Sequence, residues 1–418
     1  MMKTKKNPEM DMRTRIIWGA VLIAVGLLVL FLFAFSTEAG QMTKFGLNLS
    51  KGDAFVVPDL LLPTQPTNYL LALILVGVGA FQMARGVKST GTLVAVLAFS
   101  FVMAFLVWAA RDKSFSLVGM LSSSVVRATP IALAALCGVI SERAGVTNIG
   151  IEGTMLFAAQ VSVIVGTISG NLWVALLAAI LTGGLVASLH AFLVIKFKVD
   201  QIISGTAVNI LGAGVTSFVS SRFLEKNIDA LNNSGTLPSI SIPLLSKIPV
   251  IGPVLFENTP IVYLTIILVA VLHIVLFYTP WGLRTRAVGE HPKAADTLGV
   301  NVYLMRYVNV IFGGMFAGLG GAYFTIGSVG RFDEVMTAGK GFIGLAAMIF
   351  GKWTPIGAYT SSLIFGFADS LQVKLQILKV GIPPEFLLMA PYIVTMIVLT
   401  GVVGKAVAPA ADGAPYEK

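Results

Sequence analysis

The feature that most constrains this chain is a stretch of 43 consecutive residues, 153–195, that contains no aspartate, glutamate, lysine or arginine. A helix needs about 20 apolar residues to cross a hydrocarbon core about 30 Å thick, so this stretch can supply two membrane spans. Only 12% of the 418 residues are charged, whereas soluble globular chains carry about 25%. The sequence therefore predicts a membrane protein and argues against a soluble enzyme, a disordered chain and a nucleic-acid-binding protein.

Apolar runs of similar length recur along the chain, and they predict an all-α, polytopic membrane protein. We expect about ten transmembrane helices, at 16–35, 69–84, 90–109, 117–140, 153–168, 172–194, 201–221, 261–279, 307–326 and 386–403. Only the fourth run contains a charged residue, Arg127. Two shorter runs, 342–351 and 355–371, predict a re-entrant hairpin, which is tolerated at membrane depth only where protein or a cavity surrounds it.

The distribution of lysine and arginine predicts which loops are cytoplasmic. With both termini inside the cell, the inner loops carry these residues at about twice the density of the outer loops. The loop 280–306 is then cytoplasmic, whereas 36–68 and 222–260 are external. The first apolar run follows several basic residues, but it is longer than a signal-peptide core and has no small-residue cleavage site, so we expect a retained helix.

The segment 141–153, which reads SERAGVTNIGIEG, interrupts the apolar pattern. Its glycines each lower helix propensity by about 1 kcal/mol relative to alanine, and Asn148 is a suitable N-cap. We therefore expect one helix to end near Ser141 and another to begin near Asn148. Two readings stay open: Asn148, Gly150 and Glu152 face a translocation path beside free helix ends, or the segment is a plain cytoplasmic turn.

The loop 280–306 contains signals for a short helix outside the bilayer. Pro292 suits the first helical position and Gly299 suits a C-terminal stop, which predicts a two-turn helix between them. Ala294 and Ala295 give this helix a small face that a partner protein could approach closely. The alternative reading is a solvated connector without a partner.

Asp369 is the clearest acidic residue inside an apolar segment. An acid at membrane depth is a candidate functional residue, and the alternative is an interface charge that is paired with Lys374 or wetted near a helix end. Elsewhere, Gly314 and Gly318 form a G-x-x-x-G pattern, which indicates close helix packing rather than a substrate contact.

The sequence lacks the patterns of common catalytic and nucleotide-binding sites. It has no G-x-x-x-x-G-K-[ST] loop to hold ATP, no G-x-S-x-G and no H-E-x-x-H. Its three histidines are scattered, and Cys137 is its only cysteine. We therefore expect neither an enzyme nor a metal site.

Four motifs resemble those of the permease subunits of nucleoside and simple-sugar ABC importers, in the group of branched-chain amino acid and ribose-type permeases. They are TPIALAALCGVISERAGVTNIGIEGTML at 129–156, RAVGEHPKAADTLGVNV at 286–302, TAGKGFIGLAAMIFGKWTPIGA at 337–358 and FGFADSLQ at 365–372. The similarity covers roughly residues 115–405, and it is greatest to the shorter of the two paired nucleoside permeases.

The resemblance implies an organisation for the chain and a set of partners. Residues 115–405 would form a type II-like ABC importer permease, 406–418 a cytoplasmic tail, and 1–114 an extension with three transmembrane helices that the shorter permease usually lacks. The subunit would be a multi-pass protein of the cell (plasma) membrane, surrounded by lipid and paired with a homologous second permease. A separate ATPase subunit would bind ATP, an extracytoplasmic lipoprotein would deliver cargo, and this chain would hold no cofactor and no nucleic acid.

The same motifs imply roles for individual residues. Those expected to line or shape the path are Asn148, Gly150, Glu152 and Gly153, together with the intramembrane Asp369. Those expected to dock on the ATPase are Gly289, Glu290, Pro292, Ala294 and Ala295. The external loop 222–260 would receive the lipoprotein. The expected cargo is a purine-type nucleoside; a simple sugar or branched-chain amino acid cargo and an ion-driven secondary transporter are the alternatives.

Overall fold

The structure is a computed structural model of the chain, and it describes residues 11–49, 57–87, 89–380 and 406–418 together with positions 383, 386 and 389. It divides into two compact units, Met1–Met120 with Gln372–Leu387 and Leu121–Leu371 with Leu388–Lys418. Among the described residues, nine helices are long and apolar enough to cross a membrane. The predicted all-α, polytopic class is confirmed, and the expected tenth span, 386–403, lies outside the described residues apart from positions 386 and 389.

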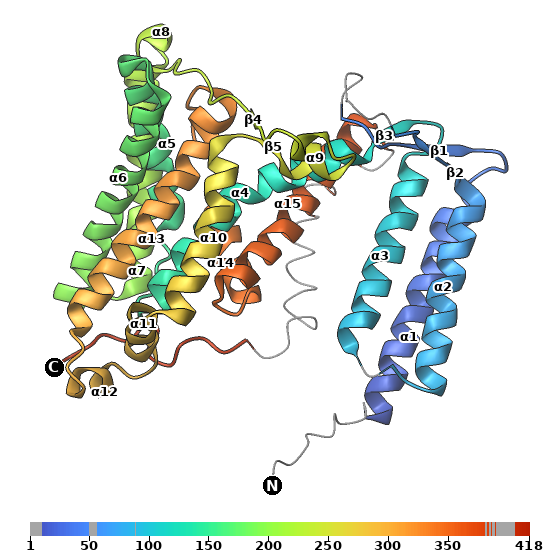
Figure 1. Cartoon of the computed structure of the whole chain (residues 1–418), viewed down its shortest axis with the longest axis horizontal. Coiled ribbons are helices and arrows are strands. Elements are labelled where there is room, and N and C mark those ends of the chain that lie inside the picture. The colour runs from blue at the N-terminus through green and yellow to red at the C-terminus, as the bar shows by residue number, and fades with distance from the viewer. Residues whose placement is uncertain are drawn as a thin grey trace. The chain divides into compact units, whose positions relative to one another are not determined.

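The first unit contains three long helices that run side by side (Figure 1). They are α1 (Met12–Val29), continued by the π-helical turn η1 (Leu30–Ala34), α2 (Thr64–Ala84) and α3 (Thr90–Ala109). α1 and α2 approach closely because both carry glycine at the crossing: a Cβ on Gly19 would lie 2.8 Å from the carbonyl oxygen of Gly79. Leu22, Leu75 and Leu93, one from each helix, meet in the core of this unit.

A small sheet lies at one end of these three helices (Figure 1). Its order is β2–β1–β3, with β1 (Met42–Gly46) antiparallel to β2 (Leu60–Pro63) and parallel to β3 (Ser114–Ser116). The rings of Phe45 and Phe115, on neighbouring strands, meet edge to face at 5.9 Å and are buried. The sequence pattern indicated only a long external loop here, because these strands are too short to show an alternating apolar pattern.

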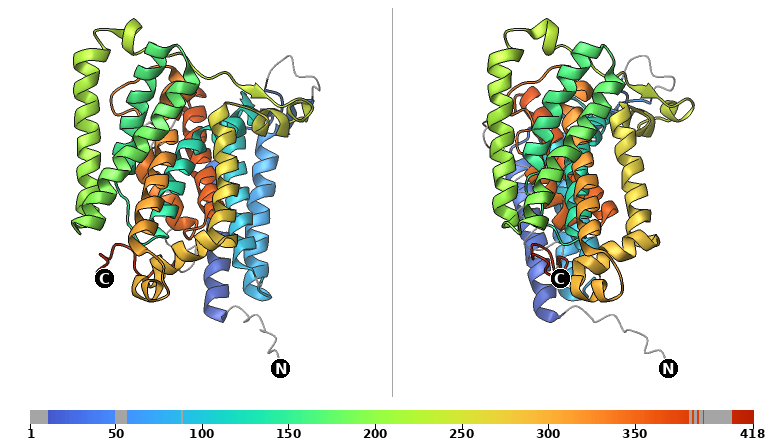
Figure 2. Two further views of the ribbon diagram at one scale, coloured as in Figure 1. Left: turned by 60° about the vertical axis from the view of Figure 1, so that its left-hand side comes forward. Right: turned by 90° about the vertical axis from the view of Figure 1, so that its left-hand side faces the viewer.

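The helices from α4 onward form the bundle of the second unit, except that the first four residues of α4 and the last six of α15 belong to the first unit (Figures 1 and 2). Its long helices are α4 (Leu117–Glu142), α5 (Ile151–Ser169), α6 (Leu172–Ala191) with η2 (Phe192–Lys196), α7 (Gln201–Val219) with η3 (Ser220–Leu224), α10 (Pro260–Tyr278), α13 (Val302–Phe324) with η5 (Thr325–Val329), and α15 (Pro355–Ile377). Its shorter elements are α8 (Ile228–Leu231), β4 (Ile240–Ser241), η4 (Leu245–Lys247), α9 (Ile251–Leu255), β5 (Glu257–Asn258), α11 (Pro280–Glu290), α12 (Pro292–Thr297) and α14 (Lys340–Phe350). β4 and β5 pair antiparallel.

The centre of this bundle is built on small residues. α6 and α13 cross so closely that a Cβ on Gly183 would lie 2.7 Å from the Cα of Gly318. Gly314, one turn earlier on α13, would also collide with α6 if it carried a side chain. Any larger residue at these positions would push the two helices apart. The prediction that the G-x-x-x-G pattern serves helix packing is confirmed.

α14 and α15 form the predicted hairpin, but its two arms are unequal. α14 has 11 residues, which gives a helix about 16 Å long, too short to cross a membrane. α15 continues past the predicted end at 371 to Ile377 and has 23 residues. The helix passes through the paired Asp369, which the predicted range already included, and continues through Lys374, a basic residue that suits the last turn of a helix.

Candidate functional site

The chain between α4 and α5 turns back into the bundle. Gly145 adopts a φ of +77°, which is easy for glycine, and reverses the chain after the end of α4. Three residues later, the side-chain nitrogen of Asn148 lies 3.7 Å from the sulfur of Cys137. Cys137 precedes the end of α4 by five residues, which is about 7.5 Å along a helix axis. α5 therefore begins inside the bundle, beside the wall of α4, rather than at its end.

The predicted path residues Asn148, Gly150 and Gly153 are tied into this segment. The side-chain oxygen of Asn148 accepts the N–H of Gly150 at 3.0 Å. Asn209 on α7 accepts the N–H of Gly153 at 2.8 Å and donates to the carbonyl of Ile149 at 2.9 Å. A Cβ on Gly153 would lie 2.8 Å from the Cα of Asn209. Asn209 was not predicted as a site residue; its only signal in the sequence is an amide side chain within the apolar run 201–221.

Glu152 joins the start of α5 to the start of α14. Its Oε1 accepts the hydroxyl of Thr337 at 2.5 Å and the N–H of Gly339 at 2.8 Å, and its Oε2 accepts the N–H of Gly341 at 2.6 Å. The side chain is 7% exposed. A carboxylate is stabilised here because it sits in the first turn of α5 and at the N-terminus of α14, where free N–H groups carry partial positive charge.

The turn between α14 and α15 is fastened to the end of α4. The indole N–H of Trp353 donates to Glu142 at 2.5 Å, and the guanidinium of Arg143 donates to the Trp353 carbonyl at 2.9 Å. Lys352 and Trp353 both adopt positive φ, 54° and 51°, which is uncommon for residues with side chains. The short helix α14 is thus held at both ends, by Glu152 at its start and by Glu142 and Arg143 at the turn.

Asp369 pairs with two cations from other helices. Its Oδ2 lies 3.0 Å from Arg127 on α4, and its Oδ1 lies 3.1 Å from Lys340 at the start of α14. The alternative reading of the sequence had proposed Lys374, on the same helix as Asp369, as its partner. These three charged side chains line a cavity of about 330 Å³ together with Tyr323 and several serines. Asp369 stands out in the sequence, but its pairing with Lys340 does not.

The predicted short helix outside the long helices is present as α12. Of the predicted docking residues, Gly289 is buried, and a Cβ there would collide with the backbone of the α4–α5 turn. Ala295 is 3% exposed and packs inside the second unit. Ala294 and Glu290 are exposed and Pro292 is partly exposed. This segment therefore has an inner face that packs against the rest of the second unit and an outer face that is exposed.

Leu298, directly after α12, is 85% exposed. It stands next to the exposed face of α12, between the exposed Thr297 and Gly299. A single exposed leucine is common on protein surfaces, but this one adjoins the segment that the sequence marks for docking. The sequence analysis did not select it.

The C-terminal tail, residues 406–418, packs against the same segment, and the C-terminus lies at the α12 end of this unit (Figures 1 and 2). The N–H of Ala411 donates to the carbonyl of Gly289 at 2.9 Å. Tyr416 is 5% exposed and shares a hydrophobic cluster with Ala295. The tail therefore covers the inner face of α11 and α12.

Two carboxylates extend this contact. Glu290 accepts the N–H of Ala410 at 3.2 Å, and Asp412 accepts the hydroxyl of Thr147 in the α4–α5 turn at 3.0 Å. Burial raises the pKa of the Asp412 carboxyl above its ordinary value. The tail thus links the α11–α12 segment to the turn from which α5 restarts.

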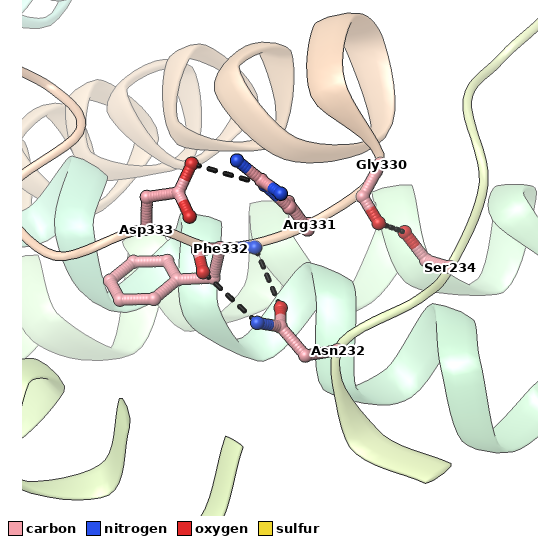
Figure 3. A network of polar contacts seen from close by, with 6 residues as sticks. All are labelled: Asn232, Ser234, Gly330, Arg331, Phe332 and Asp333. Atoms are coloured by element: carbon pink, nitrogen blue, oxygen red, sulfur yellow. Dashed lines mark hydrogen bonds and ion pairs between the residues drawn. The ribbon is translucent and has the colours of Figure 1, made fainter. Parts of the chain in front are cut away.

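At the other end of the bundle, the loop 222–260 is held against the loop after η5 (Figure 3). Asn232 accepts the N–H of Phe332 at 2.7 Å and donates to its carbonyl at 3.0 Å. Ser234 donates to the carbonyl of Gly330 through both its N–H, at 3.0 Å, and its hydroxyl, at 3.1 Å. The long loop predicted as external therefore has a fixed base on this unit.

A bundle of span-length helices, with one helix restarting inside it and a short helix outside it, is the architecture of a polytopic membrane permease. Residues 120–399 match the family described as the permease component of branched-chain amino acid transport systems, and the chain belongs to this family. It is a multi-pass membrane protein and a transport subunit, not an enzyme.

Three relatives are named for their cargo. The chain is 43% identical to the guanosine ABC transporter permease protein NupQ of Bacillus subtilis, over 71% of this chain and 95% of the relative. It is 41% identical to the nucleoside ABC transporter permease protein NupC of Lactococcus lactis, over 72% and 96%. It is 36% identical to the putative glucose ABC transporter permease protein TsgC13 of Haloferax volcanii, over 64% and 80%. No solved structure matches the chain.

Proposed function

We propose that this chain is one membrane subunit of an ABC importer and forms the translocation path for nucleosides, with purine nucleosides preferred. The observation that carries this proposal is the identity of 43% and 41% to permease proteins named for guanosine and for nucleosides, across 95% or more of those relatives. The relative named for glucose is less similar in sequence, and the alignment covers only 80% of its length. A simple sugar is therefore the second candidate cargo.

The chain supplies the path, and a separate ATPase subunit supplies the energy. The sequence has no P-loop, so ATP binds to that partner. Closure of the ATPase on ATP moves the helices that it grips and shifts the importer between outward-facing and inward-facing states. A homologous second permease completes the path, and an extracytoplasmic lipoprotein delivers the cargo.

The five path residues act in two ways in this proposal. Asn148, Gly150, Glu152 and Gly153 shape the path, because their hydrogen bonds and close packing hold the start of α5 inside the bundle. Asp369 faces a cavity and is the member of the set that can meet cargo. Glu152 fixes α14, and its two carboxylate oxygens are engaged with the protein.

The orientation follows from the charge distribution and the position of the short helix. The α4–α5 turn, α11, α12 and the tail lie on the cytoplasmic side, with both termini, and the loop 222–260 lies outside. Leu244 in that loop is 82% exposed, so it offers an apolar contact for the lipoprotein. In this proposal residues 1–114 form a separate N-terminal extension and residues 115–405 form the permease domain.

The ATPase docks on the exposed face of the α11–α12 segment. Ala294 allows close approach, Leu298 supplies an apolar anchor, and Glu290 and Pro292 border them. Gly289 and Ala295 support this surface without touching the ATPase. They are buried and hold the segment against the tail and the α4–α5 turn. Motion of α12 is passed to α5 through those contacts.

The proposal is tested by uptake of labelled guanosine into vesicles that contain this chain, the second permease, the ATPase and the lipoprotein. The expected result is uptake that requires ATP on the side of the membrane where the ATPase lies. This uptake stops when the P-loop lysine of the ATPase is replaced. The matched control is the same vesicles with a sodium or proton gradient and no ATPase. Uptake in that control would identify an ion-driven transporter, and ATP-dependent uptake of glucose without guanosine would replace the cargo.

A further inference from the structure

The charged cavity lies near the middle of the membrane-spanning helices. Arg127 precedes the end of α4 by 15 residues and Asp369 follows the start of α15 by 14 residues. At 1.5 Å per residue both are about 21–23 Å from the α14–α15 turn end of these helices. Transported molecules bind near the membrane midplane, where helices are interrupted. α14 begins at this level, at Lys340.

Charges at this depth persist when they are paired or when they function. Here one carboxylate holds two cations, with Arg127 at 3.0 Å on one oxygen and Lys340 at 3.1 Å on the other. The three side chains leave one positive charge in excess. A carboxylate has about four acceptor positions and a guanidinium has five donors, so a single contact to each partner leaves capacity for a guest molecule. The cluster thus has more charge and more hydrogen-bonding groups than a neutral ion pair requires.

The cavity that these side chains line combines polar and aromatic walls. Its volume of about 330 Å³ lies at the lower end of the range for small-molecule sites. Tyr323 and Phe324, whose rings meet edge to face at 5.4 Å, form one side, and Ser328 adds a hydroxyl. A guest with a flat ring, hydrogen-bond acceptors and hydroxyl donors matches this lining.

We propose that the cavity between α4, α13, α14 and α15 is a cargo subsite that binds a nucleoside through Asp369, Arg127 and Lys340. This inference rests on the proposed function and deepens it. Asp369 accepts hydrogen bonds from the ribose hydroxyls, and Arg127 donates to the acceptor edge of the base. Arginine makes paired bonds to the adjacent O6 and N7 of guanine, and bases stack on aromatic rings. A neutral cargo leaves the ion pairs to Asp369 intact, whereas an anionic cargo has to displace that carboxylate from its cations.

The subsite is tested on the complete importer by photolabelling with 8-azidoguanosine and mapping of the labelled peptides. The expected label falls on the α13 peptide that contains Tyr323 and Phe324, and excess guanosine removes it while glucose does not. Asp369→Asn lowers the labelling about tenfold, as expected when hydrogen bonds to a charged group are weakened. The matched control is Asp333→Asn, which changes an exposed ion pair with Arg331, and its labelling stays at the level of the unmodified importer.

A second variant guards against a protein that does not fold. Arg127→Lys keeps the charge next to Asp369 but removes the paired donors, so it lowers the preference for guanosine over adenosine while adenosine labelling persists. Label that maps to helices other than α4, α13, α14 and α15 in an importer that takes up guanosine would overturn the subsite and leave the proposed function standing. If Asp369→Asn left the labelling unchanged and Arg127→Lys left the preference for guanosine unchanged, the subsite would also be overturned and the proposed function would stand. An importer that takes up no nucleoside would overturn both proposals.

Discussion

Replacement of Glu152 by glutamine should loosen α14 without removing any atom from the packed interior. Glutamine keeps one carbonyl oxygen, which can still accept from Thr337 and Gly339. Its NH2 group then takes the place of the carboxylate oxygen that accepts the N–H of Gly341 at 2.6 Å, so two donors face each other and the Gly341 N–H loses its acceptor. A Cβ placed on Gly341 would lie 2.7 Å from the Glu152 side chain, so there is little room for the loop to move away.

The magnitude follows from the hydrogen bonds that change. A buried N–H left without a partner costs about 1–3 kcal/mol. The two bonds that remain lose their charge assistance, which is worth about 1 kcal/mol each. The expected loss for Glu152→Gln is therefore about 3–5 kcal/mol in the free energy of unfolding. The side chain is 7% exposed, so solvent offers little compensation.

The assay is reversible unfolding of the purified protein in detergent, followed by circular dichroism and by tryptophan fluorescence. Trp353 lies at the turn that ends α14, so its fluorescence should change at a lower denaturant concentration in the variant. The control is Glu334→Gln, the same substitution at an exposed site in the loop before α14, with an expected change below about 0.5 kcal/mol. A Glu152→Gln variant that matches this control would refute the view that Glu152 holds α14.

Two further predictions concern the inner end of the bundle. Leu298→Asp should weaken co-purification of the ATPase about tenfold, as expected for loss of an apolar interface anchor. The control is Leu244→Asp, which changes a similarly exposed leucine in the loop 222–260 and should leave co-purification unchanged. Equal effects of the two variants would contradict the docking surface. Burial raises the pKa of Asp412 above its ordinary value of 3.8, so docking of the tail is favoured below that value and weakens as the pH rises through the raised pKa. Hydrogen–deuterium exchange in 406–418, corrected for intrinsic rates, should increase from about pH 4 upward, and Asp412→Asn should abolish this increase; a tail whose protection does not change with pH would disprove the prediction.

The sequence was sufficient for features that local residues encode. Glycines and Asn148 marked the break between α4 and α5, and Pro292 marked the start of α12, where the structure has it. The N-cap of α5 was predicted wrongly: it is Gly150 rather than Asn148, whose side chain instead accepts the N–H of Gly150 within the turn. Span-length apolar runs gave the membrane fold because the hydrocarbon thickness sets the helix length. The spacing of Gly314 and Gly318 predicted the close packing of α13, because these small residues themselves lie at the contact with the neighbouring helix.

The remaining features depend on residues far apart in the chain. Lys340 and Asp369 can both be seen as charged residues in the sequence. The residues next to them do not predict that they meet Arg127 in one cavity. The predicted end of α15 at 371 is six residues short of Ile377, because a run of apolar residues does not show that a helix continues past a charge such as Lys374. α12 has six residues, too few for a repeating pattern to separate the inner face at Ala295 from the outer face.

The tail has a consequence for synthesis of the protein. Residues 406–418 fill the inner face of α11 and α12, yet they are translated more than a hundred residues after that segment. At about 5–20 residues per second the gap is on the order of ten seconds. During that interval the hydrophobic cluster around Ala295 lacks Tyr416, and the hydrogen bond between Ala411 and Gly289 has not formed. Chains released before the tail is made would therefore leave these apolar side chains uncovered, and transiently exposed apolar surface of this kind is what chaperones act on.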